Sequence, residues 1–161
     1  MATWSEFEAA EPEMAAAGRR LLWVPGIGFG YIATIRADGG PRIHPVNLVI
    51  ADGRLLSFLV PSPKLDDLRR DPRHALHSAG AADVADEFHV TGRATVRDGD
   101  PELRRLAAGT IGFRVADDHV LVELGIGSAL WAHYSTPPSF PPTYRRWHAA
   151  SWESPGGSQN A

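Results

Sequence analysis

The stretch from residue 30 to residue 60 constrains the fold most strongly, because it contains three strand-like runs separated by two turn signals. The runs cover residues 31–37, 42–50 and 55–60, and the signals between them are Asp38-Gly39 and Asp52-Gly53. An Asp-Gly pair between apolar runs is typical of a tight β-hairpin, since both residues tolerate positive φ. The sequence therefore predicts a three-stranded antiparallel meander.

The segment before the meander is expected to be helical. Ser5 can cap a helix, and Glu8 follows three residues later, as in a capping box. Pro12 favours a restart of this helix, which should end by Leu22. A glycine-rich stretch then leads from Pro25 into the first strand.

The segment after the meander adds two short helices and four strands. The helices are expected from Pro63 to the Asp71-Pro72 pair and over residues 101–108, and the strands over residues 74–78, 87–96, 120–134 and 144–149. In the strand 87–96, Gly92 indicates a bulge or a close approach of another backbone. The pattern predicts a small, mainly β (α+β) barrel with helices at its ends. Residues 1–150 are expected to form one domain, and residues 151–161 a tail that is disordered by composition over 154–161.

Composition excludes several functional classes. The net charge of −3 disfavours a nucleic-acid binder, which needs a basic surface. The chain has no cysteine, so disulfides, thiolate nucleophiles and cysteine-bound metals are excluded. The acidic N-terminal segment is unlike a secretory signal, and no apolar run approaches the length of a membrane span. A soluble, cytoplasmic protein is expected.

The helix that begins after Ser62 is the first candidate binding element. Ser62 suits the N-cap and Pro63 the first helical position, so the backbone N–H groups of Lys64, Leu65 and Asp66 are expected to be available to an anion. Lys64 is the single lysine beside 15 arginines, and a cation in the first turn opposes the helix dipole unless an anion lies between them. The pattern is compatible with a phosphate site, and the alternative is that Lys64 is an exposed surface residue.

The second strand of the meander is the other candidate. Arg42, His44 and Val46 share one face of a regular strand, and Pro45 removes a ladder donor, which suits an edge or bulge beside a ligand. The alternative is a solvent-facing arginine and a structurally paired histidine. His74 and His77 would lie on opposite faces of their strand, so no metal site is predicted.

The order of these features resembles the pyridoxamine 5′-phosphate oxidase-like superfamily of FMN-binding split β-barrels. The matching stretches are GYIATIRADGGPRIHPVNLVIADGRLLSFLVPSPKLDDLRRDPRHALHS and EFHVTGRATV, which cover roughly residues 28–97, and the C-terminal RRW is similar to a common ending of the superfamily. The resemblance implies a six-stranded antiparallel split β-barrel, a bound FMN, and a homodimer with the cofactor at the subunit interface.

The resemblance also implies a set of cofactor-binding residues. Arg42 and Lys64 would hold the cofactor phosphate with help from Ser62, the stretch from His44 to Asn47 would follow the isoalloxazine edge, and Glu87 matches a glutamine that contacts the flavin. The full set is Arg42, Ile43, His44, Pro45, Val46, Asn47, Ser57, Phe58, Ser62, Lys64 and Glu87. His44 and His89 are candidates for proton transfer. Since the flavin would carry the redox chemistry, no nucleophile is required.

Two departures distinguish the chain from the true oxidase. Pro63 replaces an arginine of the phosphate site, and the arginine-rich segment that holds pyridoxal phosphate is not recognisable near the C-terminus. The expected activity is therefore an FMN-dependent oxidoreductase other than pyridoxamine phosphate oxidase. Related branches leave two alternatives open, which are a reductase that uses the deazaflavin coenzyme F-420 and a non-catalytic flavin- or haem-binding protein.

Overall fold

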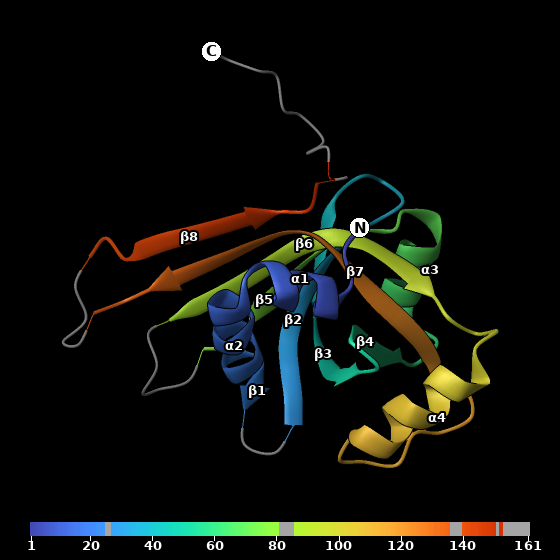
Figure 1. The fold of residues 1–161 in the computed structure, drawn as a ribbon. Coiled ribbons are helices and arrows are strands. Elements are labelled where there is room, and N and C mark those ends of the chain that lie inside the picture. The colour runs from blue at the N-terminus through green and yellow to red at the C-terminus, as the bar shows by residue number, and fades with distance from the viewer. Residues whose placement is uncertain (25–26, 81–85, 136–139, 151, 153–161) are drawn as a thin grey trace.

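The computed structural model describes residues 1–24, 27–80, 86–135, 140–150 and 152 (Figure 1). Its helices are α1 (Trp4–Ala10), α2 (Pro12–Leu21), α3 (Pro63–Arg70) and α4 (Pro101–Thr110). Its strands are β1 (Trp23–Val24), β2 (Ile27–Ile35), β3 (Pro41–Ala51), β4 (Arg54–Leu59), β5 (Arg73–Ser78), β6 (Glu87–Val96), β7 (Val120–His133) and β8 (Thr143–His148). The predicted tail lies almost wholly outside the described residues.

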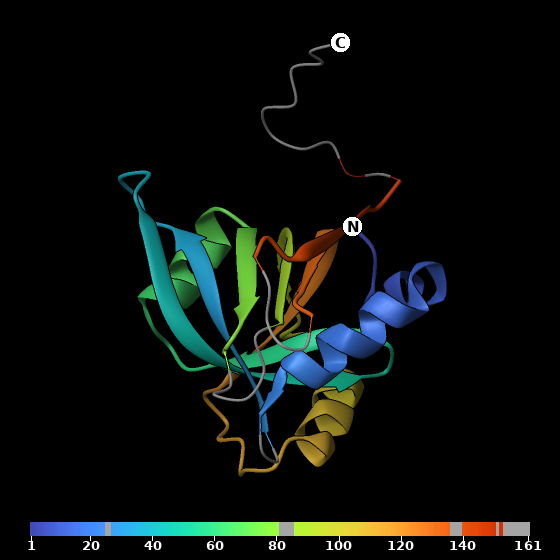
Figure 2. The same cartoon turned by 90° about the vertical axis from the view of Figure 1, so that its left-hand side faces the viewer.

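Six of the strands close into an antiparallel barrel. The sheet runs in the order β1-β2-β3-β4-β7-β6-β5, and β2 also pairs with β5, which joins the two ends of the path. β8 extends the sheet by pairing with β7 outside this closed circuit. The predicted fold, a six-stranded antiparallel barrel with short flanking helices, is confirmed. Helices α3 and α4 lie well apart in both views (Figures 1 and 2).

Both predicted hairpins are present. Asp52 and Gly53 have φ values of 49° and 65°, and Ala51 pairs directly with Arg54, so a two-residue turn with two positive φ angles joins β3 to β4. Gly39 has φ of 81° in the turn between β2 and β3. These turn residues therefore set the register of the meander.

Two boundaries differ from the sequence-based expectation. The capping box of α1 uses Thr3 and Glu6, two residues before the predicted Ser5 and Glu8, and this start lets Trp4 and Phe7 become fully buried. β2 begins at Ile27, inside the stretch expected to be a glycine-rich loop. A Cβ on Gly28 would lie 2.1 Å from the Leu48 carbonyl oxygen, so glycine permits β3 to approach β2 closely.

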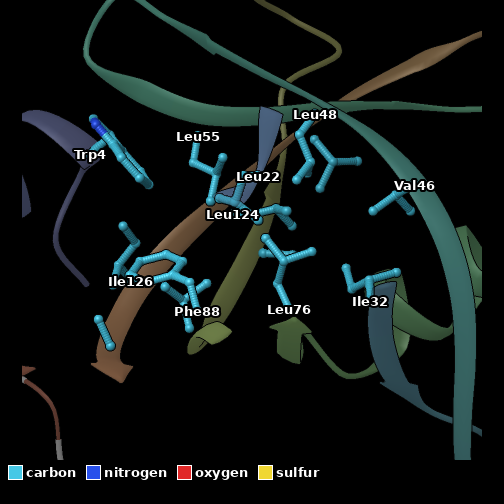
Figure 3. Packing of buried hydrophobic residues seen from close by; sticks show 14 of the residues in the cluster. Trp4, Leu22, Ile32, Val46, Leu48, Leu55, Leu76, Phe88, Leu124 and Ile126 are labelled. Carbon is cyan, nitrogen blue, oxygen red and sulfur yellow. The ribbon is translucent and has the colours of Figure 1, made fainter. Parts of the chain in front are cut away.

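The barrel interior holds the main apolar cluster. Ile32, Val46, Leu76 and Phe88 converge there from four strands (Figure 3). Gly92 lies at a register shift in the antiparallel pairing of β6 with β7. A Cβ on Gly92 would lie 1.8 Å from the Gly125 carbonyl oxygen. The predicted close approach at Gly92 is thus confirmed.

A second apolar cluster packs α4 against the outer faces of β3 and β4. It includes Val49, Phe58, Leu103 and Ala107. No helix in the described part of the chain is long and apolar enough to cross a membrane.

Candidate functional site

The β3 residues around Arg42 alternate between the two faces of the sheet, as the sequence predicts. Arg42 and His44 pair across the ladder with Thr34 and Ile32, both of which are buried. Because directly paired residues share a face, Arg42, His44 and the buried Val46 point toward the barrel interior. Ile43, Pro45 and Asn47 point outward, and Ile43 is 68% exposed. Of the predicted β3 residues, Arg42 contacts α3, through Asp67.

The N-terminus of α3 has the predicted start but fewer free donors than expected. Ser62 is the N-cap residue and Pro63 the first helical residue. The backbone N–H groups of Leu65 and Asp66 both donate to the Ser62 carbonyl, at 2.9 and 3.2 Å, which leaves that of Lys64. The Ser62 hydroxyl donates to the Val60 carbonyl at 2.8 Å and does not cap the helix. Charge on Lys64, more than the backbone, therefore makes this end suitable for an anion.

A buried carboxylate that sequence reasoning missed links α3 to β3. Asp67 is 3% exposed and accepts hydrogen bonds from Thr34 Oγ1 at 2.9 Å, Arg42 Nε at 2.7 Å and Arg70 Nη2 at 3.1 Å. Burial raises the pKa of Asp67, but these hydrogen bonds outweigh it and the pKa is lowered, so the group stays ionised. Arg42 is held through Nε, and its two terminal nitrogens make no hydrogen bond to the described residues.

His44 completes this group of side chains. Its Nε2 atom is buried and has no hydrogen-bond partner among the described residues. Burial lowers the pKa of His44, and the positive charges of Lys64 and Arg42 lower it further, against a smaller opposite effect of Asp67. A neutral imidazole results, which offers a ligand one donor and one acceptor rather than another charge. We call Arg42, His44, Lys64 and Asp67 the α3 cluster.

The predicted residues on β4 have structural surroundings. Ser57 is fully buried, and its hydroxyl donates to the Asn47 carbonyl at 2.8 Å, which ties β4 to β3. Phe58 lies in the second apolar cluster, with the Arg104 guanidinium 5.3 Å above its ring. Ser57 and Phe58 are consecutive on β4 and point to opposite faces of the strand, so at most one of them can face a given ligand.

Glu87 and His89 lie away from the α3 cluster. Both are on β6, which is separated from β3 by β2 and β5, roughly 14 Å at the usual strand spacing. They point outward, whereas Arg42 and His44 point inward. A single chain therefore does not bring the two groups of predicted residues together.

The preceding residue, Asp86, anchors the start of β6. Its buried carboxylate accepts hydrogen bonds from Trp131 Nε1 at 3.1 Å, from the Tyr134 backbone N–H at 3.0 Å and from His133 Nδ1 at 3.0 Å. Burial raises its pKa, but these bonds outweigh that effect and the pKa is lowered. The neighbouring Glu87 is left exposed on the outer face.

A separate cavity of about 580 Å³ lies beside α2 and is lined in part by Arg19, Arg20 and Trp23. Each arginine is paired with a carboxylate, Arg19 with Glu8 at 3.1 Å and Arg20 with Asp86 at 3.3 Å. Its charge is thus balanced, and the α3 cluster remains the better candidate for a phosphate.

The sequence was compared with models of known protein families. A family model described as pyridoxamine 5′-phosphate oxidase matches residues 21–126, which contain the whole α3 cluster. The chain belongs to the pyridoxamine 5′-phosphate oxidase family. No curated protein sequence matches it.

Solved structures share the fold of this family member at low sequence identity. A haem-binding protein from Mycobacterium smegmatis is 15% identical with a TM-score of 0.63, over 83% of this chain and 57% of that one. A NimC/NimA family protein from Clostridium acetobutylicum is 18% identical with a TM-score of 0.59, over 82% and 94%. An FAD-binding protein from Mesorhizobium loti is 20% identical with a TM-score of 0.58, over 72% and 91%. The chain therefore spans little more than half of the first of these proteins.

Proposed function

We propose that this family member is an FMN-dependent oxidoreductase that does not act on pyridoxamine phosphate. The observation that carries the proposal is the surplus of positive charge in the α3 cluster. Arg42 and Arg70 contact the buried Asp67 carboxylate, and Lys64 adds a third positive charge. Neither Lys64 nor the terminal nitrogens of Arg42 have an ion-pair partner among the described residues. A phosphate dianion matches this arrangement in charge and in hydrogen-bonding capacity.

The residues of the α3 cluster fit an FMN phosphate. Arg42 and Lys64 would hold the phosphate, and the unpartnered His44 Nε2 would face the part of the cofactor nearest the barrel. The flavin would supply the hydride or electron chemistry. Pro63, which lacks an N–H and a charge, occupies the position at which the true oxidase has an arginine, so one expected phosphate contact is missing.

We also propose that the cofactor site is completed by a second copy of the chain. Glu87 and His89 point outward from the opposite side of the barrel, so they could contact the flavin only across a homodimer interface. The outward face of β2 and β3 exposes Tyr31 by 44% and Ile43 by 68%, together with Pro45. Such an apolar surface is typical of an interface between copies.

Lys64 provides the direct test. Replacing Lys64→Ala should weaken FMN binding by about 1.5–3 kcal/mol, which is roughly a 10- to 150-fold rise in Kd. The change removes a charge-assisted contact to phosphate, and flavin fluorescence titration of the purified chain measures it. Arg69→Ala is the matched control, because Arg69 is on the same helix but pairs with Asp98. Equal affinity of the wild type and Lys64→Ala would contradict the proposed phosphate site.

The haem-binding neighbour favours one second candidate, a non-catalytic haem- or flavin-binding protein. Parallel titrations with FMN, haem and the deazaflavin coenzyme F-420 separate these cofactors. The oxidoreductase proposal requires that the loaded protein turns over with a reductant. A protein that binds haem in preference to FMN, or binds FMN without turnover, would support the binding role.

A further inference from the structure

A row of side chains crosses the outer face of the barrel on the side away from the α3 cluster. Tyr31 pairs with His77 between β2 and β5, and His77 pairs with His89 between β5 and β6. Directly paired residues in adjacent antiparallel strands point to the same side, with Cβ atoms about 5 Å apart. Two imidazoles twelve positions apart in the sequence therefore lie side by side on one outward surface.

The His77 ring is already oriented. Its Nδ1 lies 2.7 Å from the Ser78 carbonyl oxygen. Because a carbonyl oxygen only accepts, Nδ1 is the donor, and Nε2 is the ring nitrogen left to bind a metal. Metal-bound histidines usually have this arrangement, in which the second ring nitrogen donates to a backbone carbonyl or a carboxylate. His77 is exposed, so Nε2 is open to an incoming ligand.

His89 is suited to the same role from the neighbouring strand. A neutral imidazole has the lone pair that a metal ion requires. Among the described residues, the His89 ring contacts His77 and makes no hydrogen bond that would occupy its nitrogens.

The distance between the two imidazole rings is close to that expected when both bind one metal ion. Their centroids are 6.2 Å apart. With metal–nitrogen bonds of about 2.0–2.1 Å, each ring centroid lies about 3.2 Å from a bound ion, so two ligated rings are about 5.2 Å apart in tetrahedral geometry and at most about 6.4 Å apart. The observed separation thus lies within the range that two rings bound to one ion can have, about 1 Å above the tetrahedral value.

We propose that His77 and His89 form a two-histidine site for a late first-row divalent transition metal. Imidazole pairs suit Zn²⁺, Ni²⁺ and Cu²⁺ and disfavour Mg²⁺ and Ca²⁺, and affinity should rise toward Cu²⁺. The described residues contain no group of three or more His, Cys, Asp or Glu that could hold a metal, so water or a small ligand fills the other positions. The site is distinct from the α3 cluster proposed to hold the flavin phosphate, and it shares His89 with the flavin contacts proposed across the dimer interface.

The test is a calorimetric titration of the full, untagged chain with NiCl₂ and with CuCl₂. We expect one ion per chain, tighter binding of Cu²⁺ than of Ni²⁺, and no binding of MgCl₂. His77→Ala and His89→Ala should each weaken binding at least about tenfold, since even the outer-shell partners of metal ligands contribute that much. His89→Gln serves as a second variant that retains more of the side-chain volume at this half-buried position.

His148→Ala is the matched control. His148 is exposed on β8 and pairs with Ser128, so it lies on the same side of the sheet but outside the Tyr31–His77–His89 row. Its removal should leave the affinity unchanged. Wild-type affinity in His77→Ala, or in both His89 variants, or equal binding of Mg²⁺, would overturn the proposal. FMN titration of His77→Ala, a residue outside the proposed flavin contacts, reports separately on the flavin site, so the two proposals fail independently.

Discussion

Two buried carboxylates in this barrel each contact two arginines, and they differ in what those arginines leave free. Glu123 on β7 contacts Arg54 on β4 and Arg97, which follows β6, while Asp67 on α3 contacts Arg42 and Arg70. The side chains of both acids are less than a tenth exposed, at 8% and 4%. Burial and the number of partners are therefore nearly matched.

The charges of the Glu123 group are all paired with one another, and we call such a group closed. Arg54 Nη1 donates to both carboxylate oxygens, at 2.9 and 3.1 Å, and Arg97 donates through Nε at 2.8 Å and through Nη2. Arg54 also lies 3.8 Å from Asp52, so two positive charges face two negative ones. A group of this kind joins strands and has little capacity for a ligand.

The α3 cluster is open in the sense that some of its positive charge and hydrogen-bonding atoms have no partner in the described structure. Asp67 accepts from Arg42 through Nε alone, and its other hydrogen bonds come from Thr34 and Arg70. Lys64 adds a further positive charge to the cluster. His44 contributes a buried nitrogen without a partner in the described structure. Unsatisfied hydrogen-bonding and charge capacity, rather than the presence of an ion pair, therefore distinguishes the proposed phosphate site from the structural Glu123 group.

The largest expected effect comes from breaking the closed group. Glu123→Gln leaves two arginines beside a neutral amide and should lower the free energy of unfolding by about 3 kcal/mol, the low end for a broken buried pair because both arginines are about one-third exposed. Urea denaturation measures the change, with the exposed Asp117→Asn as control. FMN affinity of the folded protein should not change, and a large loss of affinity would show that the closed group also serves the site.

The contrast between these groups also shows how far sequence reasoning reaches. The meander, the strand 87–96 and the start of α3 were predictable, because Asp-Gly turns, period-two alternation and a Ser-Pro cap are local signals. Period two also placed Arg42, His44 and Val46 on one face. The Arg42–Asp67 contact spans 25 positions and the Arg54–Glu123 contact 69, and both depend on barrel closure and register, which no local pattern encodes.

Backbone donors at α3 illustrate a second limit. The sequence predicts a capped helix there, but it does not show that the Ser62 carbonyl accepts from two of the three N–H groups expected to bind an anion. The His77–His89 pair was missed for a similar reason. From the sequence, His77 could be compared only with His74 on the same strand. The register between β5 and β6 instead places His77 beside His89 on the neighbouring strand.

Acid should weaken the fold through His74, which follows α3 at the start of β5. This residue is 5% exposed, and neither ring nitrogen has a hydrogen-bond partner in the described structure. Burial lowers its pKa from 6.5 to about 4, partly offset by the nearby Pro72 carbonyl. The unfolded chain therefore binds a proton before the folded chain as pH falls, and stability should drop by roughly 3 kcal/mol between pH 6.5 and 4.

His74→Phe isolates this effect. The variant keeps a ring of similar size and cannot be protonated, so its free energy of unfolding should fall less steeply over the same pH range. His44 and His89, whose pKa values are also lowered, add slope of the same sign in both proteins and cancel in the difference. Parallel pH curves for the wild type and His74→Phe would show that His74 does not carry the acid sensitivity.

A smaller effect is expected from opening the α3 cluster further. Asp67→Asn removes one charge-assisted contact to each arginine and should lower the free energy of unfolding by about 1.5–3 kcal/mol. The surplus positive charge that results is accessible to an anion, so phosphate or FMN should restore more stability to Asp67→Asn than to Glu123→Gln. Thermal unfolding with and without each ligand makes the comparison. Equal stabilisation of both variants would remove the distinction between an open and a closed group.

The smallest effect should come from an ion pair that is neither buried nor part of a site. Arg69 lies 3.7 Å from Asp98, and the two side chains are 48% and 58% exposed. Water solvates both charges whether or not they pair, and ordering two long side chains offsets the Coulomb attraction, so Arg69→Ala should change the free energy of unfolding by less than about 0.5 kcal/mol. Its midpoint in urea should overlay that of the wild type at 0.15 M salt and at 1 M salt. A loss close to that of Glu123→Gln would mean that the number of ion pairs, and not their burial and saturation, determines stability in this barrel.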